Sequence, residues 1–266
     1  MDNLIIKLIF AAILTAVISG SSSHLMTISK TVMLSLSLLH AVLAGSLIGI
    51  YMVHGFSIPV PMQITALIFT ILIAILAAEL VERGLSSDAA IGIIAGLSTT
   101  IIATFGYLDA TLSPIAVSEA WSYVAGLSAV VRNRDIALLT IILTIIVPIT
   151  LTFEGEFIYI AFDEDGAKAM GLRVRLYRYL LYSLCAIVAA SLSMSLGVFV
   201  SHVVIVVPGV LALKIGSKHL HIASLATSTL CMTAGYITAY TLHLPPSSGV
   251  GIMATILLTI AYIVRK

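Results

Sequence analysis

Charge is what this sequence has least of. Charged residues occupy 9% of the 266 positions and hydrophobic residues 60%, whereas a soluble domain carries about 25% charged residues. So little charge excludes a water-facing surface over the whole chain. The net charge of +1 gives no reason to expect a nucleic-acid partner. The composition therefore predicts an all-α, polytopic bundle of membrane helices in contact with lipid.

Cysteine and catalytic motifs are also scarce. Cys185 and Cys231 lie within apolar segments, where we expect buried thiols rather than a disulfide or a metal pair. The sequence contains no HExxH, GxSxG or CxxC pattern. Residues 209–218 do not fit the phosphate-binding pattern GxxxxGK[ST]. These absences disfavour an enzyme and predict that the chain itself binds no cofactor, so that any ATP binds a separate subunit.

Long apolar runs are abundant instead. A hydrocarbon core about 30 Å thick requires a helix of about 17–25 residues. Residues 113–131 are apolar but interrupted by Pro114, Glu119 and Gly126, so we expect a short re-entrant helix there. Residues 1–266 are interpreted as a single transmembrane domain, whose nine expected spans are 4–20, 32–53, 61–81, 89–108, 135–153, 176–196, 198–213, 222–242 and 249–264.

The first expected span has two interpretations, and the basic residues predict the orientation of the termini. Lys7, the apolar run after it and the small residues 20–23 are also typical of a secretory signal peptide, but eight further spans favour a retained first helix. If residues 163–175 lie inside, ten of the 13 Lys and Arg residues lie inside and three outside. This bias places the N-terminus outside and the C-terminus in the cytoplasm.

Small residues predict where helices approach closely. Gly45 and Gly49 are four residues apart in one expected span, and Gly92 and Gly96 repeat this spacing in another. Such spacing lets two backbones touch in a membrane. We therefore expect a closely packed bundle.

The longest strongly polar run, residues 162–173, lies between two expected spans. Asp163 is suited to cap a helix, Glu164 and Asp165 suit the positive end of its dipole, and Gly171 is suited to close its last turn. The run therefore predicts a short helix outside the membrane that contacts a partner.

Two histidines fall at bilayer depth, where an ionisable group is expensive. His40 lies in the second expected span with Ser37 one turn before it, and His202 lies in the seventh. Neutral imidazole binds zinc, manganese or iron, so these residues are candidates for a metal path; the alternative is a hydrogen bond between helices. The other histidines are weaker candidates, either near the outer ends of spans (His54, His243), in an inner loop as solvated or partner-contacting residues (His219, His221), or without supporting context (His24).

Charged residues on the predicted outer side form a further group. An ordinary solvated face explains them, and the alternative is a docking surface for an external partner. The group comprises Asp109, Glu119, Arg132, Arg134 and Asp135.

Four stretches, taken in order, resemble the metal-specific permease subunits of bacterial and archaeal ABC importers, the zinc/manganese/iron type. Residues 39–45 (LHAVLAG) resemble the S-H-A-V-L-P-G of that family, and residues 88–93 resemble its D-x-A-I-G-I. Residues 162–172 resemble its F-D-x-x-x-A-x-x-x-G-L, and Pro208 ends a run like its L-L-I-I-P. The likeness covers nearly the whole chain.

The resemblance implies a permease in a prokaryotic plasma membrane that moves a divalent transition metal inward by alternating access. It also implies a homodimer around a central path, two cytoplasmic ATPase subunits that bind ATP, and an extracytoplasmic metal-binding protein. Glu119, Arg132 and Arg134 are then candidate contacts to that external protein. The polar helix becomes the coupling helix, with Asp163, Glu164, Gly166, Ala167, Lys168, Met170 and Gly171 as its candidate residues.

Within that helix we expect Ala167 and Gly171 to permit close docking, and Glu164 and Lys168 to face the ATPase. The second expected span departs from the family pattern, because Leu36 replaces an aspartate four residues before His40 and Ala44 replaces the proline. Only His40 carries over as a path residue, with His202 as a compensating nitrogen ligand. Loss of the carboxylate favours zinc over manganese.

Three other functions remain as alternatives. A siderophore- or cobalamin-type importer shares the general architecture, but chains of that family are usually longer, with an extra helix, and their wide path needs no histidine. An intramembrane enzyme lacks an acid–base or nucleophile pair here, and a stand-alone secondary carrier lacks a buried carboxylate relay for proton coupling.

Overall fold

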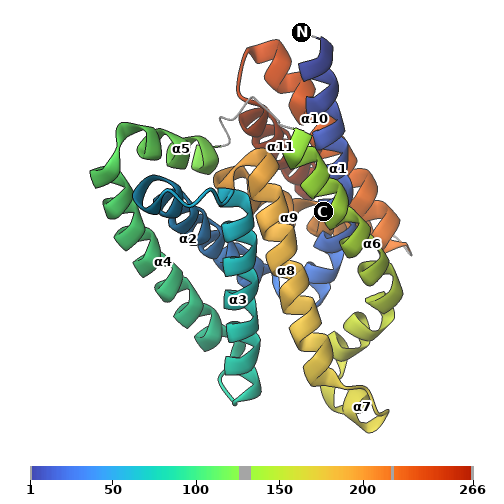
Figure 1. The fold of residues 1–266 in the computed structure, drawn as a ribbon. Helices are drawn as coiled ribbons and strands as arrows, with labels where there is room; N and C mark the ends of the chain where they lie inside the picture. The colour runs from blue at the N-terminus through green and yellow to red at the C-terminus, as the bar shows by residue number, and fades with distance from the viewer. Residues whose placement is uncertain (1, 126–132, 217–218, 265–266) are drawn as a thin grey trace.

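The structure, a computed structural model, describes residues 2–125, 133–216 and 219–264, and all regular elements in these ranges are helices (Figure 1). Nine of them are long and apolar enough to cross a membrane, which confirms the predicted membrane bundle. The helices are α1 (Asp2–Ile28), α2 (Val32–Phe56), α3 (Met62–Glu82), α4 (Ser87–Leu112), α5 (Pro114–Ala125), α6 (Asn133–Phe162), α7 (Glu164–Ala169), α8 (Val174–Leu196), α9 (Val198–Ile215), α10 (Leu220–Leu242) and α11 (Pro246–Val264).

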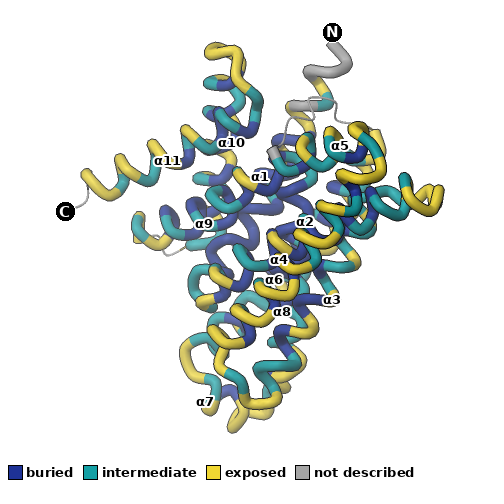
Figure 2. Tube along the Cα trace, turned by 90° about the vertical axis from the view of Figure 1, so that its left-hand side faces the viewer, coloured by how far each residue is buried: buried dark blue, intermediate teal, exposed yellow. Residues whose placement is uncertain are grey.

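Burial divides these helices into inner and outer ones. In the apolar part of each span, 78% of the residues of α1, 67% of those of α2 and 61% of those of α8 are buried. The corresponding shares are 17% in α4 and 22% in α6. Figure 2 shows the buried residues gathered in the middle of the bundle and the exposed ones along its rim. The centre therefore holds α1, α2 and α8, and the outer helices face lipid or another subunit.

Glycines set the closest helix contacts. A Cβ at Gly45 would lie 2.8 Å from the Ala66 Cα of α3, and a Cβ at Gly20 would lie 2.6 Å from the Leu225 Cα of α10. The predicted close approach at Gly45 and Gly49 is thus confirmed, since Gly49 lies equally close to Met62. A Cβ at Gly92 or Gly96 would meet nothing within 4 Å, so this face of α4 is open in the single chain.

Two predicted boundaries were wrong. The first span continues past residue 20 to Ile28, because the serines that resemble a loop satisfy their hydroxyls inside the bundle. Ser22 donates to the Ile18 carbonyl at 3.0 Å, and Ser23 donates to the Ile205 carbonyl of α9 at 2.5 Å. The fifth span continues past residue 153 to Phe162. The prediction followed the apolar run, whereas the helix itself continues through the polar residues that follow it.

Helix α5 is the short segment expected within 113–131. Its 12 residues extend about 18 Å, too short to cross a hydrocarbon core of about 30 Å. It packs against α2 and α4 at the end of the bundle opposite α7 (Figure 1). This confirms a short helix in place of a crossing, and Gly126 lies outside the described residues.

Candidate functional site

The structure brings the two candidate path histidines together. His40 in α2 and His202 in α9 have ring centroids 6.1 Å apart and an interplanar angle of 85°. The His202 Nδ1 donates to the Val198 carbonyl one turn earlier, at 2.9 Å, which leaves Nε2 with a free lone pair. Among the described residues, no hydrogen bond to the His40 ring is found. Two imidazoles with available nitrogens therefore face each other.

The surroundings of the pair are less polar than a metal site usually requires. His40 is exposed and His202 half-buried, while Leu36, one turn before His40, packs against the apolar core. Ser37 is half-buried on the same helix. The one group of three potential metal ligands within the described ranges lies elsewhere. Within one chain the pair offers nitrogen ligands and no carboxylate.

Helix α7 has the caps that the sequence predicts. The Asp163 carboxylate accepts a hydrogen bond from the Gly166 backbone N–H at 2.9 Å. At the other end Gly171 has φ +85°, its N–H donates to the Lys168 carbonyl, and the Leu172 N–H donates to the Ala167 carbonyl, both at 3.0 Å. This pair of bonds is the Schellman arrangement, in which a left-handed glycine ends a helix.

The side chains of α7 point differently from the prediction. Ala167 is completely buried within the chain, so it holds α7 against its own bundle and does not present a docking surface. Phe162 and Met170, in contrast, are 81% and 67% exposed. Phe162 opens the predicted polar run but was not among the candidate contact residues, because the capping argument singled out polar and small residues.

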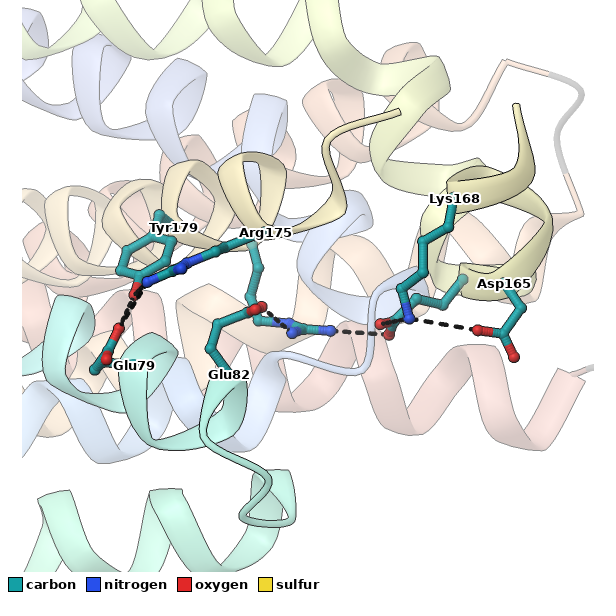
Figure 3. A network of polar contacts seen from close by, with 8 residues as sticks. Glu79, Glu82, Asp165, Lys168, Arg175 and Tyr179 are labelled. Carbon is teal, nitrogen blue, oxygen red and sulfur yellow. Dashed lines mark hydrogen bonds and ion pairs between the residues drawn. The ribbon is translucent and has the colours of Figure 1, made fainter. Parts of the chain in front are cut away.

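A network of charges joins α7 to two membrane helices (Figure 3). Arg178 of α8 pairs with Glu82 of α3 and with Glu164 of α7, the latter at 2.8 Å. Glu79 of α3 accepts from Arg83 at 2.7 Å and from Arg175 at 3.2 Å. Arg178, with 17% of its side chain exposed, is the central residue of this network.

Lys168 completes the network on α7. Its ammonium lies 2.9 Å from Glu164 and 3.3 Å from Asp165. The hydrogen bond from Lys168, with Arg178 beside it, lowers the pKa of Glu164, and the same bond raises the pKa of Lys168. Both groups are thus held in their charged forms. Glu164 and Lys168 form an ion pair with each other, and both side chains remain exposed enough to contact a partner.

The predicted outer residues differ in their surroundings. Glu119 lies on α5, 3.4 Å from His54 of α2, while Arg134 is exposed at the start of α6. Asp109, expected on a solvated face, is buried at 1% exposure. Arg132 lies outside the described residues, so its place in a docking surface is not described.

A third constellation was missed. His24 of α1, Glu154 of α6 and His221 of α10 have ligand atoms that all lie within 4.8 Å of one another. His24 has no exposed side-chain area and its Nε2 lies 3.1 Å from a Glu154 oxygen. These residues were overlooked because the predicted first and fifth spans ended before residues 24 and 154 and because His221 was placed in a loop.

Comparison with known proteins gives a consistent picture. The family model described as the ABC 3 transport family matches residues 1–265. A protein of Thermotoga maritima named probable metal transport system membrane protein is 26% identical over 249 residues, 91% of this chain and 83% of that one. The manganese transport system membrane protein MntC of Listeria innocua is 24% identical over 97% of this chain and 89% of its own. The solved structure of PsaBC from Streptococcus pneumoniae in complex with Fab has a chain of the same fold, with TM-score 0.80 and 22% identity over 97% of this chain and 91% of that one.

Proposed function

We propose, from the premise that the chain belongs to the ABC 3 transport family, that it is the permease subunit of an ATP-binding-cassette importer for a divalent transition metal. Zinc, manganese or iron enters the cytoplasm by alternating access, and a separate ATPase hydrolyses the ATP. The names of the relatives support metal as cargo, since they describe metal and manganese transport.

The observation that carries this proposal is the pair His40 and His202. An ionisable residue at membrane depth that faces the outside of its own chain is costly in lipid. Two copies of the chain, packed with these surfaces together, would instead place four imidazoles along one central path. Neutral imidazole nitrogens bind zinc, manganese and iron ions reversibly. This arrangement supports the homodimer that the family resemblance implies.

Helix α7 is the proposed contact to the ATPase. Its exposed apolar residues, Phe162 and Met170, flank a rigidly capped helix. Movement of α7 would be transmitted through Glu164 and Arg178 to α8 and through Glu82 to α3. The membrane orientation follows, with α7 and the C-terminus in the cytoplasm of a prokaryotic cell and the N-terminus outside. An extracytoplasmic metal-binding protein would then meet the end that carries α5, where Glu119 and Arg134 are candidate contacts.

Reconstituted transport tests this function. We expect proteoliposomes with this chain and its ATPase to accumulate radioactive zinc or manganese only with ATP. His40→Ala and His202→Ala should each lower uptake at least about tenfold, as loss of a metal contact does.

A matched control for these variants is His243→Ala, because His243 is an exposed histidine at the end of α10. Uptake by the chain alone, driven by an ion gradient, would contradict the ABC assignment. Wild-type uptake of every metal in both path variants would remove His40 and His202 from the path.

A further inference from the structure

We propose that His24, Glu154 and His221 form a second metal site, separate from the path pair, which binds a zinc-type divalent ion inside each chain. The three residues come from α1, α6 and α10, and 130 residues separate His24 from Glu154 in the sequence. Two imidazoles and one carboxylate are a donor set that zinc accepts, with room for a further ligand.

The geometry places the ligands within reach of one ion. Their ligand atoms all lie within 4.8 Å of one another, and zinc binds nitrogen and oxygen at about 2.0–2.2 Å. The rings of His24 and His221 meet edge to face, with centroids 5.2 Å apart. Small side-chain rotations are therefore enough to bring the donors to one ion.

An unused nitrogen supports a ligand at this place. The His221 Nδ1 is buried and has no hydrogen-bond partner among the described residues. A buried polar atom without a partner is costly, and such atoms often mark the place of an ion or a water. The His24–Glu154 hydrogen bond accounts for only one nitrogen of the cluster, so it does not explain why His221 lies against it.

His24 differs in burial from the proposed path residue His40. His24 has no exposed side-chain area, whereas His40 is exposed on the chain surface. The cluster lies near the end of α1, in the last third of α6 and at the start of α10. It thus lies in the half of the bundle that carries α7, and α6 leads directly into α7 (Figure 1). A bound ion would crosslink the C-terminal third of α6 to α1 and α10.

Zinc binding to the purified full chain tests the proposal without any transport measurement, so its failure is distinct from failure of the proposed function. The background is the metal-stripped His40→Ala/His202→Ala variant, in which the path pair is absent. Calorimetric titration should give one zinc per chain in this background, together with a rise in melting temperature.

Adding His221→Ala or Glu154→Gln should lower zinc affinity at least about tenfold and abolish the rise in melting temperature. Glu154→Gln keeps the size of the side chain and a hydrogen bond to His24 while removing the charge, so it separates metal binding from packing. The control is His243→Ala, at the opposite end of α10. Unchanged affinity in both cluster variants, or no zinc binding in the background, would overturn the proposal.

Discussion

The proposed path pair, His40 and His202, and the charge network beside α7 use ionisable residues in opposite ways. His40 and His202 face each other with nitrogens available and no carboxylate beside them. In the network, Arg178 holds a carboxylate from each of two neighbouring helices. Groups that bind a passing ion must be left free, whereas groups that transmit movement must be fixed to one another.

The cluster of His24, Glu154 and His221 combines both properties. It contains a carboxylate, as the network does, and it leaves an imidazole nitrogen unused, as the path pair does. The complete burial of the His24 side chain favours a resident ion over a passing one. The presence or absence of a carboxylate and of an unused imidazole nitrogen therefore distinguishes the three sites.

The largest expected effect comes from giving the path pair the carboxylate it lacks. Leu36→Asp places an oxygen ligand one helical turn before His40, on the same face. Carboxylates suit manganese, so the ratio of manganese to zinc uptake should rise at least about tenfold. Competition between the two metals in proteoliposomes measures this ratio. Leu36→Asn is the control, since it has the same size without the charge; an equal rise in that variant would contradict the carboxylate argument.

The next largest effect is expected from removing the ion pairs of Arg178 in the charge network beside α7. Arg178→Gln leaves Glu82 and Glu164 without their shared partner, and hydrogen bonds to charged groups are worth about 1.5–3 kcal/mol. We expect a loss of stability of about 2 kcal/mol and weaker coupling of ATP hydrolysis to uptake. Denaturation in detergent and the ratio of metal transported to ATP hydrolysed measure these effects.

The matched variant for that experiment is Arg83→Gln. Arg83 also pairs with a carboxylate of α3, but 73% of its side chain is exposed, and such pairs contribute little. Equal effects in the two variants would show that the position of Arg178 between α3 and α7 has no special role.

A third prediction separates the two faces of α7. Phe162→Ser should weaken ATPase binding about tenfold without changing stability, because an exposed aromatic side chain often dominates an interface. Ala167→Leu should instead lower stability by about 1–3 kcal/mol, since it overfills a buried position. Co-purification of the ATPase and thermal unfolding measure the two quantities. The reverse pattern would restore Ala167 as the docking residue.

The smallest effect is expected at the cap of α7. Asp163→Ala removes the acceptor for the Gly166 N–H, which costs about 1 kcal/mol. Faster backbone hydrogen exchange in α7 should result. Asp163→Asn retains an acceptor and should exchange like the wild type; an equally slow Asp163→Ala variant would show that burial of Ala167 alone holds the helix.

Much of the candidate site was predictable from the sequence, because several of its residues act through local spacing or stand out at membrane depth. Asp163 and Gly171 act on backbone groups a few positions away, so their roles follow from local spacing. His40 and His202 were identified as costly residues at membrane depth. Ala167 was misassigned because local sequence does not state which face of a short helix meets its own bundle.

The sequence by itself determined the class of this protein, its nine membrane helices and the capped helix between them, because composition, segment length and capping are local properties. Only the tertiary structure decided that His40 meets His202, that Arg178 joins three helices and that His24 meets Glu154 and His221. These contacts join residues far apart in the chain. The close packing of α1 against α10 at Gly20, for example, places the helices that carry His24 and His221 side by side.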